Sequence, residues 1–364
     1  MSEFTDLDRT SMARALALAE RGLFTATPNP RVGCVVVGQG AVLGEGFHAR
    51  AGEGHAEALA LADAQARGCD PRGSTMYVTL EPCNHHGRTP PCVDAILAAG
   101  VARVVAAMPD PNTAAAQGAA RLRKAGIDVA FGLMEREARE LNIGFVSRMT
   151  RGIPWVRLKV ATSLDGRTAL VGGASRWITG EAARADGHRW RARACAVLTG
   201  VGTVFADDPE LTVRAVETSR QPLRVVIDRH AETPPAARVL AGGNALVVTA
   251  GARNDGWPAG VEALALPDAA GRIDLVALMR ELARRGVNEL HVEGGARLNG
   301  ALISAGLVDE VLHYVAPSVL GDPARGMFEL AAPLPSLDDR VVLEWQSIDR
   351  VGADLRLIAR IRRS

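Results

Sequence analysis

The chain has 364 residues, enough for two domains of ordinary size. Its 42 lysines and arginines nearly balance its 41 aspartates and glutamates, so the net charge of +1 provides no overall field that would attract nucleic acid or anionic lipid. No apolar run approaches the roughly 20 residues of a membrane helix, and the acidic start MSEFTDLDRT is unlike a signal peptide, so we expect a soluble, cytoplasmic protein.

The first half alternates helices and strands. Alanine and leucine spacing predicts the helices, and valine-rich runs bounded by glycine predict the strands. In chain order the expected elements are a helix over 11–22, extended segments over 32–38 and 41–48, a helix over 55–68, a strand over 74–82, a helix over 90–100, a strand over 101–108, a helix over 114–126, a strand over 127–132 and a closing helix over 134–152. This order predicts a layered α/β domain with a largely parallel sheet, ending near residue 150.

The second half, 151–364, restarts the alternation and predicts a second α/β domain. Its expected elements are a strand over 155–166, a helix over 181–194, strands over 195–204, 222–228 and 244–250, a helix over 275–286, a strand over 288–295, a helix over 297–306 and a strand over 310–317. The sequence shows no repeat of 20 to 50 residues and no long low-complexity tract.

The five cysteines do not form a recognisable disulfide framework, because their number is odd. We expect Cys34, Cys69 and Cys195 to be reduced, buried, small side chains. Cys83 and Cys92 differ from these, because each directly follows a proline and two histidines lie between them.

His55, Cys83 and Cys92 have the residue types of a catalytic zinc site, which usually has three protein ligands and one open position for water. Residues two apart in mid-helix diverge by about 200°, so His55 and Glu57 can share a site only beyond the N-terminal end of their helix. Cys92 also stands at an expected helix start, where the helix dipole favours the thiolate. Two helix N-termini would then converge on one metal.

Glu57 is not needed as a ligand and is suited to take a proton from water and deliver it to a departing amine. Zinc supports this chemistry, since it lowers the pKa of bound water from about 15.7 to about 7. The pattern H-x-E, then P-C and a second cysteine, is typical of zinc deaminases of nucleobases. Those enzymes have Cys-x-x-Cys, whereas eight residues separate the cysteines here. The alternative is a closed structural zinc site with His85 or His86 as fourth ligand, which would leave Glu57 without a purpose.

Several motifs together resemble the bifunctional riboflavin-biosynthesis deaminase/reductases, and the resemblance spans nearly the whole chain. The motifs of the first half are TPNPRVG at 27–33, GEGFH at 44–48, HAE at 55–57 and TLEPCNHHGRTPPC at 79–92. The motifs of the second half are LKVATSLDGRTA at 158–169, SRWITG at 175–180, LTGVGTVFADDP at 198–209 and VEGGARLNGAL at 292–302.

This resemblance implies a cytidine-deaminase-like three-layer domain over 1–150 and a dihydrofolate-reductase-like α/β domain over 151–364. The first would use zinc to hydrolyse the amine of a phosphoribosylated diaminopyrimidinone. The second would use NADPH to reduce the ribosyl group to a ribityl chain. The family also implies a homo-oligomer, either a dimer or a tetramer, with a small-molecule substrate and no nucleic-acid or membrane partner.

The resemblance assigns roles in the deaminase site residue by residue. It implies that the zinc ligands are His55, Cys83 and Cys92, that Glu57 is the catalytic proton shuttle, and that the pyrimidine is held by Asn29 and His48. Without the family, Asn29 would be a turn residue between two prolines and His48 a loop histidine. Either His85 or His86 would contact the substrate's phosphate, and the sequence does not decide between them.

The resemblance likewise assigns residues of the reductase site. Positions that match family contacts to the nicotinamide nucleotide are Ala161, Trp177, Thr203, Asp207 and the run Gly295, Ala296, Arg297, Leu298, Asn299, Gly300 and Ala301. Positions that match substrate contacts are Ser175, Arg191, Leu211, Arg214 and Glu293, with the first, second and fourth at the phosphate.

The residues alone give weaker support for this second site. Gly294 and Gly295 precede an expected helix, whose free amides could accept a phosphate, but a double glycine serves equally as a tight connection. Thr179 is expected to cap the helix that carries Arg184, His188 and Arg191 on one face. Such a basic stripe is either a solvated surface or a phosphate cradle. No G-x-G-x-x-G follows an early strand, so a Rossmann site is not predicted.

Three other functions compete with this interpretation. A zinc deaminase with an RNA-binding second domain would need a basic surface with aromatic side chains, yet aromatic residues are only 4% of the chain. A zinc-stabilised binding module would have no catalysis, and its function would not require Glu57. A third possibility is a deaminase whose second domain has lost its reductase activity.

Overall fold

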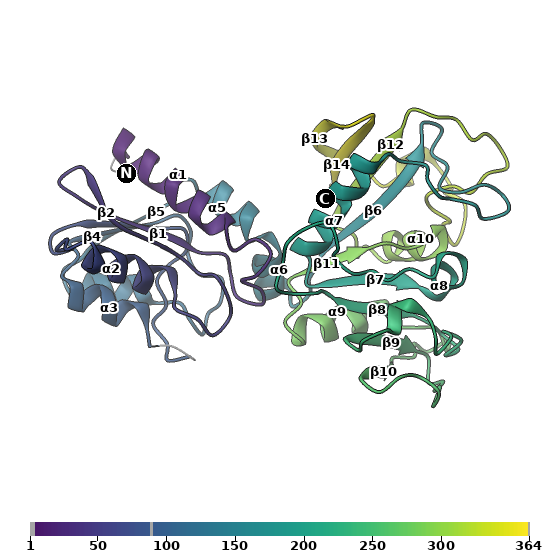
Figure 1. Cartoon of the computed structure of the whole chain (residues 1–364), viewed down its shortest axis with the longest axis horizontal. Helices are drawn as coiled ribbons and strands as arrows, with labels where there is room; N and C mark the ends of the chain where they lie inside the picture. Colours follow the sequence, from purple (N-terminus) through teal and green to yellow (C-terminus); the bar gives the residue numbers. More distant parts are fainter. Residues whose placement is uncertain (1–3, 88–89, 363–364) are drawn as a thin grey trace. The chain divides into compact units, whose positions relative to one another are not determined.

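The computed structural model describes residues 4–87 and 90–362, so Arg88 and Thr89 of the stretch between the two cysteines lie outside the described residues. The chain divides into two compact units, Met1–Gly152 and Ile153–Ser364 (Figure 1). Within the described ranges, no helix is both long enough and apolar enough to cross a lipid bilayer.

The first unit is built on a mixed sheet, rather than the largely parallel sheet that the sequence predicted. Over the described residues its strands are β1 (Gly33–Gly38), β2 (Ala41–Phe47), β3 (Thr75–Val78), β4 (Arg103–Ala106) and β5 (Asp128–Phe131), in the order β2-β1-β3-β4-β5. Strands β3, β4 and β5 are parallel, whereas β1 is antiparallel to both β2 and β3. The short connection through Gln39 and Gly40 returns the chain as a hairpin, which makes the β1–β2 pair antiparallel.

Helices cover both faces of this sheet and give three layers (Figure 1). The helices are α1 (Asp6–Glu20), α2 (Ala56–Ala66), α3 (Cys92–Ala99), α4 (Gly118–Lys124), α5 (Glu135–Leu141) and α6 (Ile143–Arg151). Met12 and Ala15 of α1 and Ala138 of α5 pack on one face of the sheet. On the other face, α2, α3 and α4 pack against the side chains of alternate residues of the same strands.

Two glycines in β2 allow α2 to lie directly on the sheet. A Cβ on Gly44 would lie 2.2 Å from the carbonyl oxygen of Ala60, and a Cβ on Gly46 would lie 2.4 Å from that of Ala56. Because α2 presents alanines to these glycines, the backbones approach more closely than larger side chains would permit. This contact fixes the start of α2 and with it the position of His55.

The second unit contains a larger sheet that is parallel except at one end. Over its described residues the strands are β6 (Trp155–Ser163), β7 (Ala196–Gly200), β8 (Leu223–Ile227), β9 (Ala245–Thr249), β10 (Val261–Ala265), β11 (Glu289–Val292), β12 (Glu310–Ala316), β13 (Leu343–Val351) and β14 (Asp354–Ile361). Their order is β10-β9-β8-β7-β11-β6-β12-β14-β13. The pairs β12–β14 and β13–β14 are antiparallel, and the remaining pairs are parallel.

Helices pack on both faces of this second sheet as well. They are α7 (Glu181–Arg193), α8 (Val201–Asp207), α9 (Leu275–Arg284) and α10 (Ala296–Ser304), with short 3-10 turns η1 (Arg238–Leu240) and η2 (Leu337–Asp339). Leu278 and Leu282 of α9 and Leu302 of α10 belong to the main apolar core on one face. Helix α7 covers the other face and packs through Ala183 against β12.

A buried ionic cluster holds α7 on the sheet. Arg157 of β6 donates to Glu310 and, over 3.0 Å, to Glu289. From α7, the ring of Trp190 lies 4.4 Å from the Arg157 guanidinium, and Arg193 Nε donates to Glu289 Oε2 over 2.7 Å. Because removing one partner from such a cluster would leave an uncompensated buried charge, the helix has little freedom to move.

Two predicted helices of the first unit are shorter than expected. The helix predicted over 134–152 is interrupted at Asn142, whose side chain donates to the carbonyl of Arg31 and accepts from its N–H, over 2.9 and 2.7 Å. The helix predicted over 114–126 begins only at Gly118, which packs so tightly that a Cβ there would lie 1.8 Å from the carbonyl oxygen of Pro82. In both cases a tertiary contact overrides the local helix preference.

Other predictions for the second unit were wrong in detail. The strand predicted over 195–204 ends at Gly200, where α8 begins. Thr179 does not cap α7; the N-cap is Gly180, whose N–H donates to Asp354 Oδ2 over 2.7 Å. Strands β10, β13 and β14 were not predicted.

None of the five cysteines forms a disulfide, as predicted, but the predicted burial is confirmed for only one of three. Cys34 is buried in β1, whereas Cys69 and Cys195 are only partly buried. The prediction of burial was therefore wrong for Cys69, which follows α2, and for Cys195, which precedes β7. Residue type alone could not show that these two cysteines stand at the ends of elements rather than inside them.

Replacing Gly46 by alanine should destabilise the first unit by about 1–3 kcal/mol, because the new Cβ would overlap backbone atoms of α2 that cannot rotate away. Urea unfolding of the full chain measures this loss. Gly38→Ala in β1 is the matched control, since its Cβ would meet only the side chain of Leu43, at 2.8 Å. Equal midpoints for the two variants would contradict the close packing of α2 on β2.

Candidate functional site

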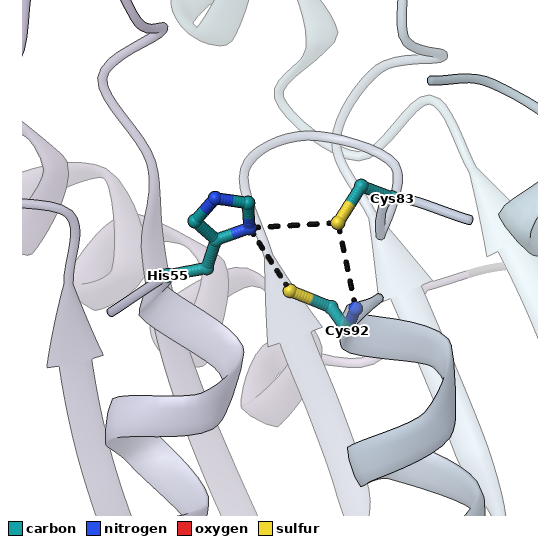
Figure 2. A group of neighbouring side chains, drawn as sticks. All are labelled: His55, Cys83 and Cys92. Atoms are coloured by element: carbon teal, nitrogen blue, oxygen red, sulfur yellow. Dashed lines mark hydrogen bonds between the residues drawn. The ribbon is translucent and has the colours of Figure 1, made fainter. Parts of the chain in front are cut away.

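Three side chains of the first unit point toward one another at one end of its sheet (Figure 2). His55 is the N-cap of α2, Cys83 lies in the loop after β3, and Cys92 is the first residue of α3. Nδ1 of His55 lies 3.2 Å from Sγ of Cys92 and 3.4 Å from Sγ of Cys83. The three donor atoms lie within 4.8 Å of one another. The structure therefore brings together all three predicted zinc ligands.

This donor set fits a catalytic zinc ion better than a closed structural one. One imidazole and two thiolates are ligands that zinc accepts, and they leave a fourth position open. Of the described residues, neither His85 nor His86 joins the group, and both are exposed. The closed site that the sequence left as an alternative has no fourth ligand in this arrangement.

The local electrostatics favour a thiolate at Cys83. Hydrogen bonds from the Cys92 thiol and from His55 lower the pKa of Cys83, and the backbone N–H of Cys92 donates to the same sulfur over 3.4 Å. That N–H belongs to the first turn of α3, where the helix dipole also favours negative charge. A thiolate is the form of cysteine that binds metal.

Glu57 lies in the first turn of α2, immediately beside the donor set. Its side chain is buried and interacts with the thiol of Cys92. Burial raises the pKa of Glu57 to about 7. The His55–Glu57 spacing therefore works as the sequence predicted, because His55 lies just outside the helix and Glu57 just inside it.

Asn29 and His48 are close to the donor set and to each other. Nδ2 of Asn29 lies 3.0 Å from Nε2 of His48, and Nδ1 of His48 lies 3.0 Å from the carbonyl of Gly54. The carbonyl requires the proton on Nδ1, so Nε2 accepts from Asn29. Burial lowers the pKa of His48, which favours this neutral form. The rings of His48 and His55 meet edge to face, with centroids 5.4 Å apart.

In the second unit, the predicted phosphate ligands meet a carboxylate. Arg191 of α7 forms a two-point ion pair with Glu293, which directly follows β11; its Nη2 donates over 2.9 Å. Nη1 of Arg191 donates to the carbonyl of Thr212 over 3.2 Å. Arg214 lies two residues after Thr212. Its backbone N–H lies 3.4 Å from Nδ1 of His188, which is one turn before Arg191 in α7. Arg191 thus lines a polar site and not a solvated helix surface.

The charges of this site shift the pKa values of Glu293 and Arg214. Despite burial, the charge of Arg191 holds the pKa of Glu293 well below its usual range. Burial and the charge of Arg191 both lower the pKa of Arg214. Glu293 is therefore a carboxylate at neutral pH that pairs with the guanidinium of Arg191, whereas the guanidinium of Arg214 pairs with Glu210.

A second group of predicted residues surrounds the start of α10 and fits a phosphorylated cofactor. Gly295 is the N-cap of α10, and Oγ1 of Thr203 lies 3.9 Å from the position that a Cβ on Gly295 would occupy. The Oδ1 atom of Asn299 is buried without a hydrogen-bond partner among the described residues, although its Nδ2 donates to the carbonyl of Met327. The glycine at the start of α10 is compatible with a nucleotide phosphate bound there, whereas the free acceptor of Asn299 requires a donor group.

The other residues of the α10 run differ in their surroundings. Arg297 is exposed and pairs with Glu329. A Cβ on Gly300 would lie 1.9 Å from the carbonyl oxygen of Glu329, so this glycine has a packing role. Ala296, Leu298 and Ala301 continue the same helix.

Five predicted residues lie outside these two groups. Trp177 has 68% of its surface exposed and lies beneath the guanidinium of Arg184, 4.6 Å from the ring centre. Ser175 donates to Asp207 over 3.4 Å, which brings a predicted substrate residue to a predicted cofactor residue. The remaining two are Ala161, within β6, and Leu211, buried under η1.

Sequence reasoning missed two titratable residues near Glu293. Lys159 lies two residues before Ala161 in β6, and its charge acts on Glu293 and Arg191. His291 lies two residues before Glu293 and is buried. In a strand, residues two apart lie on the same face. Lys159 could therefore have been predicted from Ala161, and His291 from Glu293.

Family models match both halves of the chain. The "Cytidine and deoxycytidylate deaminase zinc-binding region" matches residues 5–108, and the "RibD C-terminal domain" matches residues 154–357. These matches confirm the predicted order of a cytidine-deaminase domain followed by a reductase domain.

Similar proteins cover almost the whole chain. The riboflavin biosynthesis protein RibD of Escherichia coli is 48% identical and aligns with 96% of this chain and 98% of its own. RibD of Haemophilus influenzae is 44% identical, with 98% of each chain covered. Among solved structures, Acinetobacter baumannii RibD has a TM-score of 0.91 at 41% identity, covering 98% of this chain and 99% of its own. A diaminohydroxyphosphoribosylaminopyrimidine deaminase/5-amino-6-(5-phosphoribosylamino)uracil reductase of Thermotoga maritima has a TM-score of 0.89 at 34% identity, with the same coverage.

Cys92→Ala should abolish stoichiometric zinc binding, because two ligands with an open arrangement hold the ion much more weakly than three. Metal analysis of the purified protein after dialysis measures this. Cys69→Ala is the matched control, since Cys69 lies outside the donor group and should leave one zinc per chain. Full zinc content in the Cys92 variant would contradict the ligand set.

Proposed function

The chain belongs to the RibD family of bifunctional deaminase/reductases in riboflavin biosynthesis, and from this premise we propose which of its residues carry each reaction. We assign the deaminase to residues 1–150 and the NADPH-dependent reductase to residues 151–364. The proposed substrate is 2,5-diamino-6-(5-phosphoribosylamino)pyrimidin-4(3H)-one, and the proposed final product is 5-amino-6-(5-phosphoribitylamino)uracil. The relative from Thermotoga maritima, whose name includes both activities, supports this substrate.

Deamination is assigned to the buried group around Glu57. His55, Cys83 and Cys92 would hold zinc, which when bound activates water for attack on the carbon that carries the amine. Glu57 would accept a proton from the attacking water and deliver it to the departing amine, so that ammonia leaves and a carbonyl remains. The observation that carries this proposal is the buried carboxyl group of Glu57 beside a donor set that, among the described residues, consists of three ligands.

Asn29 and His48 are proposed to orient the pyrimidine. Because the amide nitrogen of Asn29 is engaged by His48, its Oδ1 is the atom left to accept a hydrogen bond from the substrate. The neutral His48 is fixed by Gly54 and keeps Asn29 in place. His85 or His86, both exposed near Cys83, would contact the substrate's phosphate, and this assignment stays open between them.

Reduction is assigned to the site around Arg191 and Glu293. Arg191, Arg214 and Ser175 would hold the phosphate, while Leu211 and Glu293 would contact the rest of the substrate. NADPH, when bound, supplies the hydride for the ribosyl group. The chain's own contribution is to hold the cofactor with Ala161, Trp177, Thr203, Asp207 and residues 295–301, and so to align donor and acceptor carbons.

The alternative of an RNA deaminase is not favoured, because the second half matches the RibD C-terminal domain. A non-catalytic zinc module is likewise not favoured, since relatives at 48% and 44% identity are riboflavin biosynthesis proteins over nearly their full length. Location in the cytoplasm stays a prediction from the sequence.

We also propose assembly into homo-oligomers through β13, the last strand of the second sheet. Over the described residues, β13 pairs only with β14 and exposes Trp345 and Ile348, with 62% and 60% of their surfaces accessible. If two copies of β13 pair antiparallel about Ser347, Glu344 of each copy lies opposite Arg350 of the other. An exposed apolar strand edge with this charge symmetry favours a second copy of the same chain as its partner.

Glu57→Gln should keep one zinc per chain and lower the rate of ammonia release by about 10²–10⁴-fold, because the amide cannot move the proton. NADPH oxidation with the already deaminated intermediate should stay at the wild-type rate and serves as the internal control. Metal analysis and an ammonia assay on the same sample provide the two measurements. Loss of zinc, or loss of both reactions together, would contradict the assignment.

Trp345→Arg should reduce the molar mass of the assembly, because a charge would replace an apolar contact in the proposed interface. Size-exclusion chromatography with light scattering measures the mass. Val319→Arg is the control, since Val319 is similarly exposed, at 69%, but belongs to the segment after β12 and not to β13. A monomeric wild-type chain, or an unchanged mass for the Trp345 variant, would overturn this interface.

A further inference from the structure

His291 is a buried titratable side chain with no role in the reactions assigned so far. It lies in β11 and is fully buried, and neither ring nitrogen has a hydrogen-bond partner among the described residues. An unpaired polar group in a protein core is costly, and an apolar side chain of similar size would fill the same space without that cost. A histidine at this position therefore points to a partner that is engaged in another state of the enzyme.

The closest candidate partner is the carboxylate of Glu293. His291 and Glu293 are two residues apart and lie on the same side of the strand. Nε2 of His291 lies 3.5 Å from Oε1 of Glu293, just beyond ordinary hydrogen-bond distance. On its other side, His291 is next to Arg157, its registered neighbour in β6, which is already bound by Glu289 and Glu310. Among its described neighbours, the Glu293 side is therefore the one open to a new bond.

The proton needed for such a bond is available. Burial lowers the pKa of His291, so the ring is neutral at neutral pH and carries one N–H. With that hydrogen on Nε2, the ring can donate to Glu293 after a shift of a few tenths of an ångström. Lys159 also acts on Glu293 through its charge.

Arg191 explains why Glu293 does not need His291 in the present state. The guanidinium forms two hydrogen bonds with the carboxylate and a third with the carbonyl of Thr212. Arg191 is also the proposed ligand of the substrate's phosphate. A guanidinium that turns toward a phosphate cannot keep the same two-point geometry with Glu293, because its donors lie in one rigid plane.

We propose that His291 is a positioning residue of the reductase, which donates from Nε2 to Glu293 when Arg191 turns from this carboxylate to the substrate's phosphate. The inference rests on the proposed role of Arg191. The exchange would keep Glu293 fixed against the substrate while its principal partner is withdrawn. It would also give the imidazole of His291 a hydrogen-bond partner, so that this buried group is unpaired without substrate and paired when substrate is bound.

Three variants of the full, zinc-loaded chain test this proposal. His291→Phe keeps the shape of the side chain but removes the donor, His291→Gln restores an N–H donor, and Arg191→Gln removes the proposed phosphate ligand. KM and kcat are measured for the deaminated phosphoribosylated pyrimidine at saturating NADPH. Ammonia release and the melting temperature are measured on the same samples.

We expect His291→Phe to raise the KM of the reductase substrate about tenfold, the factor that one hydrogen bond to a charged group contributes. Its melting temperature without substrate should be equal to or higher than that of the wild type, because an unpaired buried polar group is removed. His291→Gln should recover most of the KM, and ammonia release should not change. A purely structural histidine would instead lower the melting temperature and leave KM unchanged.

Two results would overturn the proposal in different ways. If Arg191→Gln raises KM but His291→Phe leaves it at the wild-type value, the inference about His291 fails and the phosphate site stands. If Arg191→Gln leaves KM unchanged, the proposed phosphate site fails and the role of His291 fails with it. Equal KM values for folded His291→Phe and His291→Gln would also overturn it, since only the second retains a donor.

Discussion

The meeting of two helix starts at one end of a sheet is the constraint on which the deaminase half depends. His55 precedes α2 and Cys92 begins α3, so their donor atoms can approach within 3.2 Å only if both helices begin at the same place. The glycines of β2 fix the first helix against the sheet. The first turn of α3, whose Cys92 N–H donates to Cys83, then favours the thiolate on which a metal ion depends. Packing and electrostatics therefore specify the same position.

In the reductase half, the alternation of side chains along its strands brings the charged residues together. Alternate residues of β6 and β11 place charged side chains on one face of the central sheet, beneath α7. Part of this array, around Arg157, is fully satisfied by Glu289 and Glu310 and anchors the helix. In the proposed reduction, the part around Arg191 and Glu293 exchanges partners. The same layer would then provide a fixed support and an adaptable binding surface, separated by one buried histidine.

The zinc ligands could be predicted from the sequence because metal-binding residue types are few and their spacing is local. His55 and Glu57 needed only the rule that they flank a helix start. The alternation of helices and strands was likewise sufficient for two α/β units. Their sheet orders were not predictable, because β11 enters between β7 and β6 through pairing that no local pattern encodes.

The sequence was least informative where contacts join distant parts of the chain. Arg157 and Glu310 are 153 residues apart, and Asn142 and Arg31 are 111 apart, so neither the ionic cluster nor the helix break at Asn142 had a local signal. Strand β13 has apolar residues that face solvent, so burial could not mark it as a strand. Its exposure becomes understandable only if another surface covers it.

The placement of the last strand has a consequence for how the protein is made. Strand β14 lies inside the second sheet, between β12 and β13. Its Asp354 accepts a hydrogen bond from the N–H of Gly180, the N-cap of α7. Strand β6 is the first strand of that unit to be synthesised, but it pairs with β11 and β12, which are synthesised much later. The first unit has all its strands by residue 131 and can fold while the ribosome is still translating the second. On the growing chain, the first unit can therefore fold early, whereas the sheet of the second unit is complete only once β14 has been synthesised.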